Sequence, residues 1–182
     1  MKISFETGLV ALLIIDMQNG VVTNAYNRDI VIANINELIE RARRNQIPIV
    51  WVQHSDEQLQ INSNEWQIVP ELKPRENEII INKKYGDAFE DTLLENKLKQ
   101  IGIKKVFVTG AQTEACIRAT LHGSFVRGFD TVLISDAHTT EDYTSYGLPS
   151  PEVIINFTNT YWTWQSAPGR QGAVLKTDEI IF

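Results

Sequence analysis

The chain has a single cysteine, no cluster of basic residues and no long apolar run, and each absence excludes a class of protein. One cysteine cannot form an intrachain disulfide or a thiolate metal cage. Seventeen basic side chains stand against 23 acidic ones, a net charge of −6, which disfavours nucleic-acid binding. No stretch approaches the roughly 18 apolar residues of a membrane helix. Since there is neither a convincing export signal nor a disulfide framework, we expect a cytoplasmic protein without a membrane partner.

What the chain does contain is typical of one globular domain. Hydrophobic residues make up 43% of its 182 residues and charged residues 22%. This length supports a single sizeable core, so one domain over residues 1–182 is expected.

Short runs rich in Val and Ile alternate with longer amphipathic segments. The runs cover residues 9–15, 47–52, 79–81, 106–109 and 131–135, and 173–176 could add a last strand. Helical spacing of apolar residues covers 29–45, 87–101 and 113–127, and a late helix is expected at 150–162. This alternation predicts an α/β fold with a mostly parallel sheet covered by helices on both faces. The aperiodic segment 55–77 is expected to form a wall or lid over a site.

Reactive side chains stand just after the apolar runs, where parallel sheets bind their ligands. Asp16 closes the first run, where it could act as a general base or cap the next turn. Gln18 could hold a substrate amide or cap the same turn. Lys83 and Lys84 follow the third run, and one of them could pair with Asp16. Cys116 follows the fourth.

Cys116 could be a small buried filler or a nucleophile. A thiol in the first turn of a helix is close to unpaired N–H groups and the positive end of the helix dipole, which favour the thiolate. A carboxylate, an ammonium and a thiol on three strand ends supply what acyl transfer to sulfur requires.

Four blocks of sequence, in this order and spacing, resemble the isochorismatase-like cysteine hydrolases. The matching blocks are residues 12–18 (LLIIDMQ), 83–89 (KKYGDAF) with Thr92, 108–116 (VTGAQTEAC) and 135–137 (SDA). The resemblance implies a three-layer α/β/α fold with a six-stranded parallel sheet. It also implies homo-oligomers, since relatives are commonly dimers or tetramers.

The same resemblance assigns roles to individual residues. The catalytic triad would be Asp16, Lys83 and Cys116, with Lys83 preferred over its neighbour because of its spacing to the aromatic residue at position 89. A non-proline cis peptide would join Ala111 to Gln112, and the N–H groups of Gln112 and Cys116 would form an oxyanion hole.

Two departures from the wider family narrow the expected chemistry. The nicotinamidase branch binds a metal through an aspartate and several histidines, whereas this chain has only His54, His122 and His138, so we expect no metal and no cofactor. Isochorismatases proper lack the cysteine, so Cys116 indicates cleavage of a C–N bond in a small amide. A narrower likeness, in residues 85–87 (YGD), 136–140 (DAHTT) and 167–170 (APGR), is to the subgroup to which streptothricin hydrolase is similar, which adds lactams to the expected substrates.

Alternatives remain for both the mechanism and the function. His138, with Asp136 as its orienter, could replace Lys83 in a cysteine–histidine dyad, or it could line the pocket. Trp66 and Tyr85 are further candidates for substrate binding. The chain could also be an isochorismatase-type hydrolase of a non-amide substrate, or a binding protein that retains the fold.

Overall fold

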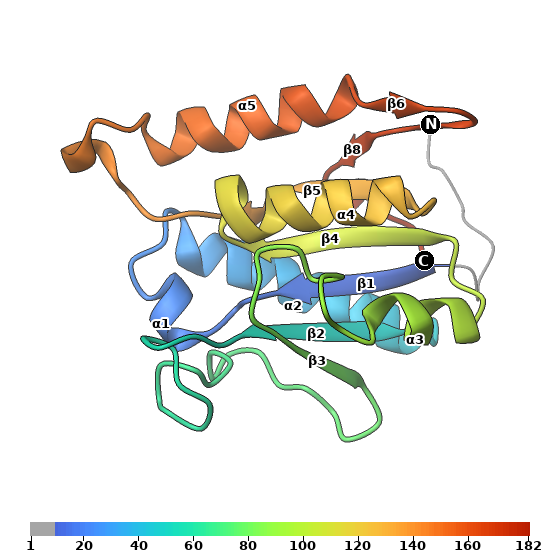
Figure 1. Ribbon diagram of the computed structural model, residues 1–182, viewed down its shortest axis with the longest axis horizontal. Helices are drawn as coiled ribbons and strands as arrows, with labels where there is room; N and C mark the ends of the chain where they lie inside the picture. Colours follow the sequence, from blue (N-terminus) through green and yellow to red (C-terminus); the bar gives the residue numbers. More distant parts are fainter. Residues whose placement is uncertain (1–9) are drawn as a thin grey trace.

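A six-stranded parallel sheet, with strand order β3-β2-β1-β4-β5-β8, forms the centre of the computed structural model, which describes residues 10–182 (Figure 1). Its strands are β1 (Val10–Ile15), β2 (Ile49–His54), β3 (Ile79–Lys83), β4 (Lys105–Ala111), β5 (Asp130–Thr139) and β8 (Ala173–Leu175). The expected α/β/α sheet is therefore confirmed, including its last strand. Leu9, the first residue of the expected first strand, lies outside the described residues.

Helices cover both faces of this sheet. They are α1 (Asn19–Val22), α2 (Arg28–Arg44), α3 (Leu94–Gln100), α4 (Arg118–Val126) and α5 (Pro151–Thr163). The helix α2 packs on one face, and α3, α4 and α5 contribute to the core on the other (Figure 1). Short elements complete the chain: η1 (Thr113–Ile117), η2 (Thr144–Tyr146), η3 (Thr177–Glu179), and the small hairpin of β6 (Ser166–Ala167) and β7 (Arg170–Gln171). Within residues 10–182, no helix is both long and apolar enough to cross a membrane.

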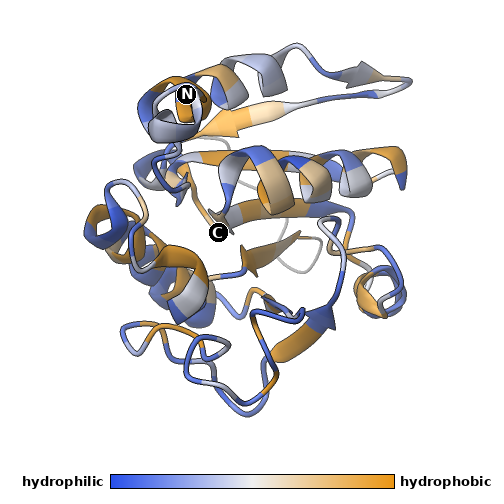
Figure 2. Ribbon diagram, turned by 60° about the vertical axis from the view of Figure 1, so that its left-hand side comes forward, coloured by the Kyte–Doolittle hydropathy of each residue, from blue (hydrophilic) through white to orange (hydrophobic). Residues whose placement is uncertain are grey.

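The central strand β1 shows why the apolar runs become buried strands. Successive side chains of a strand point to opposite faces, so Leu12 and Ile14 join the core beneath α2, whereas Leu13 and Ile15 join the core beneath α4. The central strands of the sheet are accordingly drawn mostly in orange, the colour of hydrophobic residues, in Figure 2. A strand that is apolar on both faces is stable only between two layers of helices.

Two predicted elements are clearly misplaced at one end. The helix expected at 87–101 begins only at Leu94. Asp87 accepts a hydrogen bond from the Phe89 N–H, and Asp91 has a left-handed φ of 51°, which stops a helix from forming earlier. The strand expected at 131–135 extends to Thr139 through a register shift against β4. His138 therefore lies within β5 instead of following it.

The strand order reverses at β1, since β2 pairs on one side of it and β4 on the other. Parallel α/β sheets bind ligands at such a point, beyond the carboxyl ends of the strands. Gly110 brings the two central strands close together there. Its φ is +116°, and a Cβ at this position would lie 2.0 Å from the Ile15 carbonyl oxygen. This approach places the chain after β4 beside Asp16.

Candidate active site

Lys83 and Asp16 form a buried ion pair at the carboxyl edge of the sheet. Lys83 ends β3 and Asp16 follows β1, and the Lys83 Nζ lies 2.7 Å from the Asp16 Oδ2. Their side chains are 0% and 2% exposed. Burial raises the pKa of Asp16 above its ordinary value, against the lowering effect of the Lys83 charge. Each charge is therefore tolerated in the interior because the other is present.

Hydrogen-bond acceptors surround the Lys83 Nζ. Besides Asp16, its Nζ contacts the Tyr85 carbonyl oxygen at 3.1 Å, the Cys116 Sγ at 3.2 Å and the His54 Nδ1 at 3.2 Å. All four neighbours can accept a hydrogen bond, which suits an ammonium. We therefore assign the proton of His54 to Nε2, which lies 3.2 Å from the Asp56 Oδ2.

Cys116 lies in η1, a π-helical turn between β4 and α4. Burial raises the pKa of its thiol to about 12, and the negative charge of Asp16 adds to this effect. This effect of burial opposes the stabilisation of the thiolate that is expected at a helix start. The resting arrangement is a thiol beside a carboxylate, and the Asp16 Oδ1 is buried without a hydrogen-bond partner in residues 10–182.

The peptide bond between Ala111 and Gln112 is cis. It lies directly before η1, where the Ala115 and Ile117 N–H groups both donate to the Gln112 carbonyl oxygen. The Gln112 side chain is held separately, since its Nε2 lies 3.2 Å from the Tyr143 Oη. Gln112 thus connects the turn that carries the thiol to the loop after β5.

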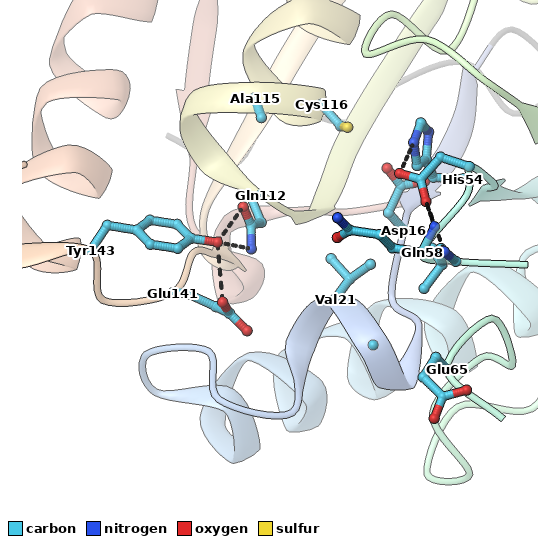
Figure 3. A pocket seen from close by; sticks show the side chains of 13 residues that line it. Asp16, Val21, His54, Gln58, Glu65, Gln112, Ala115, Cys116, Glu141 and Tyr143 are labelled. Carbon is cyan, nitrogen blue, oxygen red and sulfur yellow. Dashed lines mark hydrogen bonds and ion pairs between the residues drawn. The ribbon is translucent and has the colours of Figure 1, made fainter. Parts of the chain in front are cut away.

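A cavity of about 520 Å³ opens above these groups. It is lined by Asp16, Gly20, Val21, His54, Asp56, Gln58, Leu59, Glu65, Gln112, Ala115, Cys116, Glu141 and Tyr143. Figure 3 shows the Cys116 thiol directed toward the side where Asp16 and His54 lie, with Tyr143 and Glu141 on the opposite side. The segment 55–77 contributes one wall of this cavity, as expected.

The structure separates Lys83 from Lys84, as the spacing predicted. The Lys83 side chain is buried beside Asp16 and Cys116, whereas Lys84 is exposed. Asp16, Lys83, Gln112 and Cys116 are thus brought together as expected.

Gln18 is wrongly predicted as a substrate-binding residue. Its side chain is fully buried and donates to the carbonyl oxygens of His54 and Trp66, while its Oε1 accepts from the His54 N–H. These contacts hold the segment 55–77 against the end of β2. Both ends of the Gln18 side-chain amide are therefore occupied by hydrogen bonds within the protein.

His138 is likewise a structural residue, and the cysteine–histidine dyad is wrong. The His138 Nδ1 lies 2.8 Å from the Thr113 Oγ1, and its Nε2 lies 3.0 Å from the Asn159 Oδ1. Both ring nitrogens are occupied by these partners, and burial lowers the pKa of His138 to about 4. Asp136 does not orient the ring, because its Oδ1 accepts from the Thr177 N–H and hydroxyl instead.

Trp66 and Tyr85 are not among the residues that line the cavity. Their backbone carbonyl oxygens accept hydrogen bonds near the site. The Trp66 carbonyl oxygen accepts from Gln18 and Gln53, and the Tyr85 carbonyl oxygen accepts from Lys83. The Tyr85 side chain is 53% exposed. Both predictions of a lining role are therefore corrected.

Sequence reasoning missed several cavity residues, namely His54 as a neighbour of Lys83, and Asp56, Glu65, Glu141 and Tyr143. His54 ends β2, so the rule about strand ends could have found it. The others lie in irregular segments without a periodic signal. Across the described residues, no three His, Cys, Asp or Glu side chains are grouped so that they could hold a metal ion.

A parallel sheet covered on both faces, with a carboxylate, an ammonium and a thiol at its carboxyl edge, is the arrangement of an α/β hydrolase. Comparison with known proteins agrees. The chain belongs to the isochorismatase family, because the family model of the isochorismatase domain matches residues 10–146.

Individual relatives support this assignment. Streptothricin hydrolase from Streptomyces noursei is 30% identical over 138 residues, which cover 72% of this chain and 55% of that protein. An uncharacterized isochorismatase family protein of Bacillus subtilis, YrdC, is 35% identical over 134 residues, covering 70% of this chain and 72% of that one. The structure of an isochorismatase from Pseudomonas putida KT2440 shares the fold, with a TM-score of 0.87 at 24% identity, covering 97% of this chain and 92% of the other.

Proposed function

We propose that this protein is a cysteine amidohydrolase, which cleaves a C–N bond of a small amide or lactam through a thioester. One observation supports the proposal: the Lys83 ammonium lies 2.7 Å from the Asp16 carboxylate and 3.2 Å from the Cys116 sulfur. Asp16 and Cys116 line the cavity, and we refer to them together with the buried Lys83 as the floor. This arrangement provides a base, a nucleophile and a counter-charge at one point.

Acylation begins when Asp16 removes the thiol proton of Cys116. The raised pKa of Asp16 brings its basicity closer to neutral pH, and the Lys83 ammonium stabilises the thiolate as it forms. The sulfur attacks the substrate carbonyl carbon, and the C=O electron pair moves to oxygen. The N–H groups of Gln112 and Cys116 are proposed to hold this oxyanion.

Collapse of the tetrahedral intermediate breaks the C–N bond, and Asp16 gives its proton to the departing nitrogen. Ammonia or an amine leaves, or, for a lactam, the amine stays attached to the opened chain. Asp16 then takes a proton from a water molecule, whose oxygen attacks the thioester. As the C–S bond breaks, Asp16 returns this proton to the Cys116 sulfur. The acid product departs and the thiol is restored, so the cycle consumes one water.

A release assay tests this proposal. The protein is incubated with a panel of small primary amides, secondary amides and lactams, and ammonia or amine is measured, with Cys116→Ala as the control. Hydrolysis that is lost in the variant supports the proposal. Equal hydrolysis by both proteins, or turnover of a vinyl ether in place of every amide, would overturn it in favour of a non-amide hydrolase. Saturable binding without any turnover would instead indicate a binding protein.

The proposed assembly is a homodimer or homotetramer, as the family likeness implies. The outer face of α5 carries the exposed apolar side chains Val153 and Phe157, and Trp164 is exposed just after the helix. Light scattering distinguishes such assemblies from the 20.7 kDa monomer.

A further inference from the structure

The wall of the cavity around the floor is acidic. Asp56 and Glu65 line it from the segment 55–77, and Glu141 lines it from the loop after β5. In the close-up, Glu141 and Glu65 lie on different sides of the space in front of the thiol (Figure 3). In the part of the chain that the structure describes, none of the residues lining this cavity is a lysine or an arginine. We refer to Asp56, Glu65 and Glu141 as the acidic rim.

Backbone and side-chain contacts hold the acidic rim in place. The Leu59 and Gln58 N–H groups donate to the Asp56 Oδ1 at 2.7 and 2.8 Å, and these contacts lower the pKa of Asp56. The Tyr143 hydroxyl lies 3.1 Å from the Glu141 Oε2. Glu65 is positioned through its backbone, since its carbonyl oxygen accepts from the Gly20 N–H at 2.8 Å.

Gly20 is needed for this close approach. A Cβ at position 20 would lie 2.9 Å from the Glu65 Cβ and 2.8 Å from the Leu59 Cδ1. The absence of a side chain therefore lets the segment 55–77 pack directly against α1, which brings Glu65 to the cavity.

The floor supplies a second and independent observation. Asp16 is 1% exposed, lines the same cavity, and leaves its Oδ1 without a hydrogen-bond partner in residues 10–182. The nearby Lys83 charge is offset by the other oxygen of the same carboxylate. The floor is thus an ion pair with little net charge, and the acidic rim sets the sign of the potential that a ligand meets.

We propose that the substrate carries a cationic group, a protonated amine or a guanidinium, beside the amide or lactam that is cleaved. This inference rests on the proposed function, which places the scissile carbonyl at Cys116. The cation would lie against the acidic rim, and a cavity of about 520 Å³ has room for both parts of a small molecule. Anionic substrates are disfavoured, because their charge would face the acidic rim without a compensating cation.

Charged thiol reagents test the potential at Cys116 without any need for turnover. Because Cys116 is the only cysteine, a methanethiosulfonate labels this thiol alone. The Cys116 sulfur attacks the reagent's thio sulfur, a mixed disulfide forms and methanesulfinate leaves. The rates are compared for a trimethylammonium-ethyl and a sulfonato-ethyl reagent. Each rate is divided by the rate with 2-mercaptoethanol at the same pH, which removes intrinsic differences between the reagents.

The acidic rim predicts that the cationic reagent reacts at least about tenfold faster than the anionic one at low ionic strength, and that salt reduces this preference. Glu65→Gln and Glu141→Gln should each lower the ratio about two- to threefold. Glu152→Gln, which makes the same charge change on the exposed surface of α5, should leave the ratio unchanged. Equal rates for the two reagents, or a ratio that neither cavity variant alters, would overturn the inference.

Kinetics with matched amides separates this inference from the proposed function. An amide with an ammonium substituent should have a kcat/KM at least about tenfold above that of its carboxylate analogue. Hydrolysis that requires Cys116 but lacks this order would overturn the inference and leave the proposed function standing. A cationic preference in labelling, together with amide hydrolysis that survives Cys116→Ala, would overturn the proposed function alone.

Discussion

The floor and the acidic rim of the cavity use charge in opposite ways. On the floor, the Asp16 and Lys83 side chains are almost completely buried and lie 2.7 Å apart. On the acidic rim, the Asp56 side chain is 50% exposed and Glu65 is exposed to solvent. A buried charge needs a partner of opposite charge to offset the cost of its desolvation. An exposed charge is solvated by water, and it attracts or repels a charged ligand that enters the cavity.

This difference predicts how each region responds to substitution. Substitutions on the floor should lower activity or stability, because each charged or reactive group there interacts with the others. Changes on the acidic rim should leave the fold intact and alter which molecules are accepted. Since Asp16 and Cys116 line the same cavity as the acidic rim, the comparison can be tested within a single protein.

The largest expected effect is on activity, when the nucleophile is removed. Cys116→Ala should reduce kcat at least about 10⁴-fold on the best amide substrate, because no other group on the floor can form the acyl intermediate. Steady-state assays of amine release measure this loss. Thermal unfolding close to that of the unchanged protein would show that the variant is folded, and a variant that keeps more than a tenth of the activity would contradict the role of the thiol.

Removing the cation of the floor should cost stability as well as activity. Lys83→Met leaves Asp16 buried without its partner, which should lower the free energy of unfolding by about 3–5 kcal/mol at pH 7. The pKa of Asp16 is already raised by burial, and protonation would neutralise it, so this loss should shrink as the pH falls. Urea unfolding between pH 5 and 8 measures both trends.

Lys84→Met is the matched control, since it removes the same charge one residue later from an exposed position. Its effect on stability should stay within about 0.5 kcal/mol. Equal losses for the two variants would show that the pair with Asp16 contributes nothing particular.

His138 separates the effect of burial on stability from the effect of the floor on activity, because it is buried but lies outside the floor. Its pKa in the folded protein is about 4, against an ordinary value of 6.5, so the unfolded chain binds more protons between these values. Stability from His138 is therefore complete above about pH 6.5 and is lost as the pH falls toward 4, by about 2–3 kcal/mol. His138→Gln should flatten this part of the stability profile while the enzyme still forms its acyl intermediate. Loss of acylation in this variant, with acylation retained in Lys83→Met, would reverse the assignment of the two residues.

The smallest expected effect on stability is on the acidic rim. Glu65→Gln should change the free energy of unfolding by less than about 0.5 kcal/mol, because the side chain is exposed and its place is fixed by the backbone. Chemical denaturation measures this change. A loss above about 2 kcal/mol would mean that Glu65 belongs structurally with the floor.

The floor could be predicted from the sequence, and the acidic rim could not. Asp16, Lys83 and Cys116 follow apolar runs, and the strand-end rule together with the ordered sequence blocks identifies them. Choosing Lys83 over Lys84 needed the spacing of the family resemblance, since alternation alone does not show which side chain points inward.

The errors have physical causes. Gln18 and His138 are polar residues near strand ends, like the floor residues, but their hydrogen bonds go to distant backbone and side-chain groups that no local pattern reveals. Glu65 and Glu141 reach the cavity from irregular segments, whose paths depend on packing such as that of Gly20. The rise in the pKa of the Cys116 thiol could not be predicted, because burial is a property of the assembled fold.

The most direct test of the central claim is to weigh the protein during turnover. An amide found in the release assay is mixed with the protein, the reaction is quenched in acid within milliseconds to seconds, and the intact mass and the peptide containing Cys116 are measured. We predict a transient adduct on Cys116, with the mass of the substrate acyl group, that appears before the steady state and is absent in Cys116→Ala. Steady amine release with no adduct on Cys116 at any time, from a protein whose Cys116→Ala variant is equally active, would contradict it.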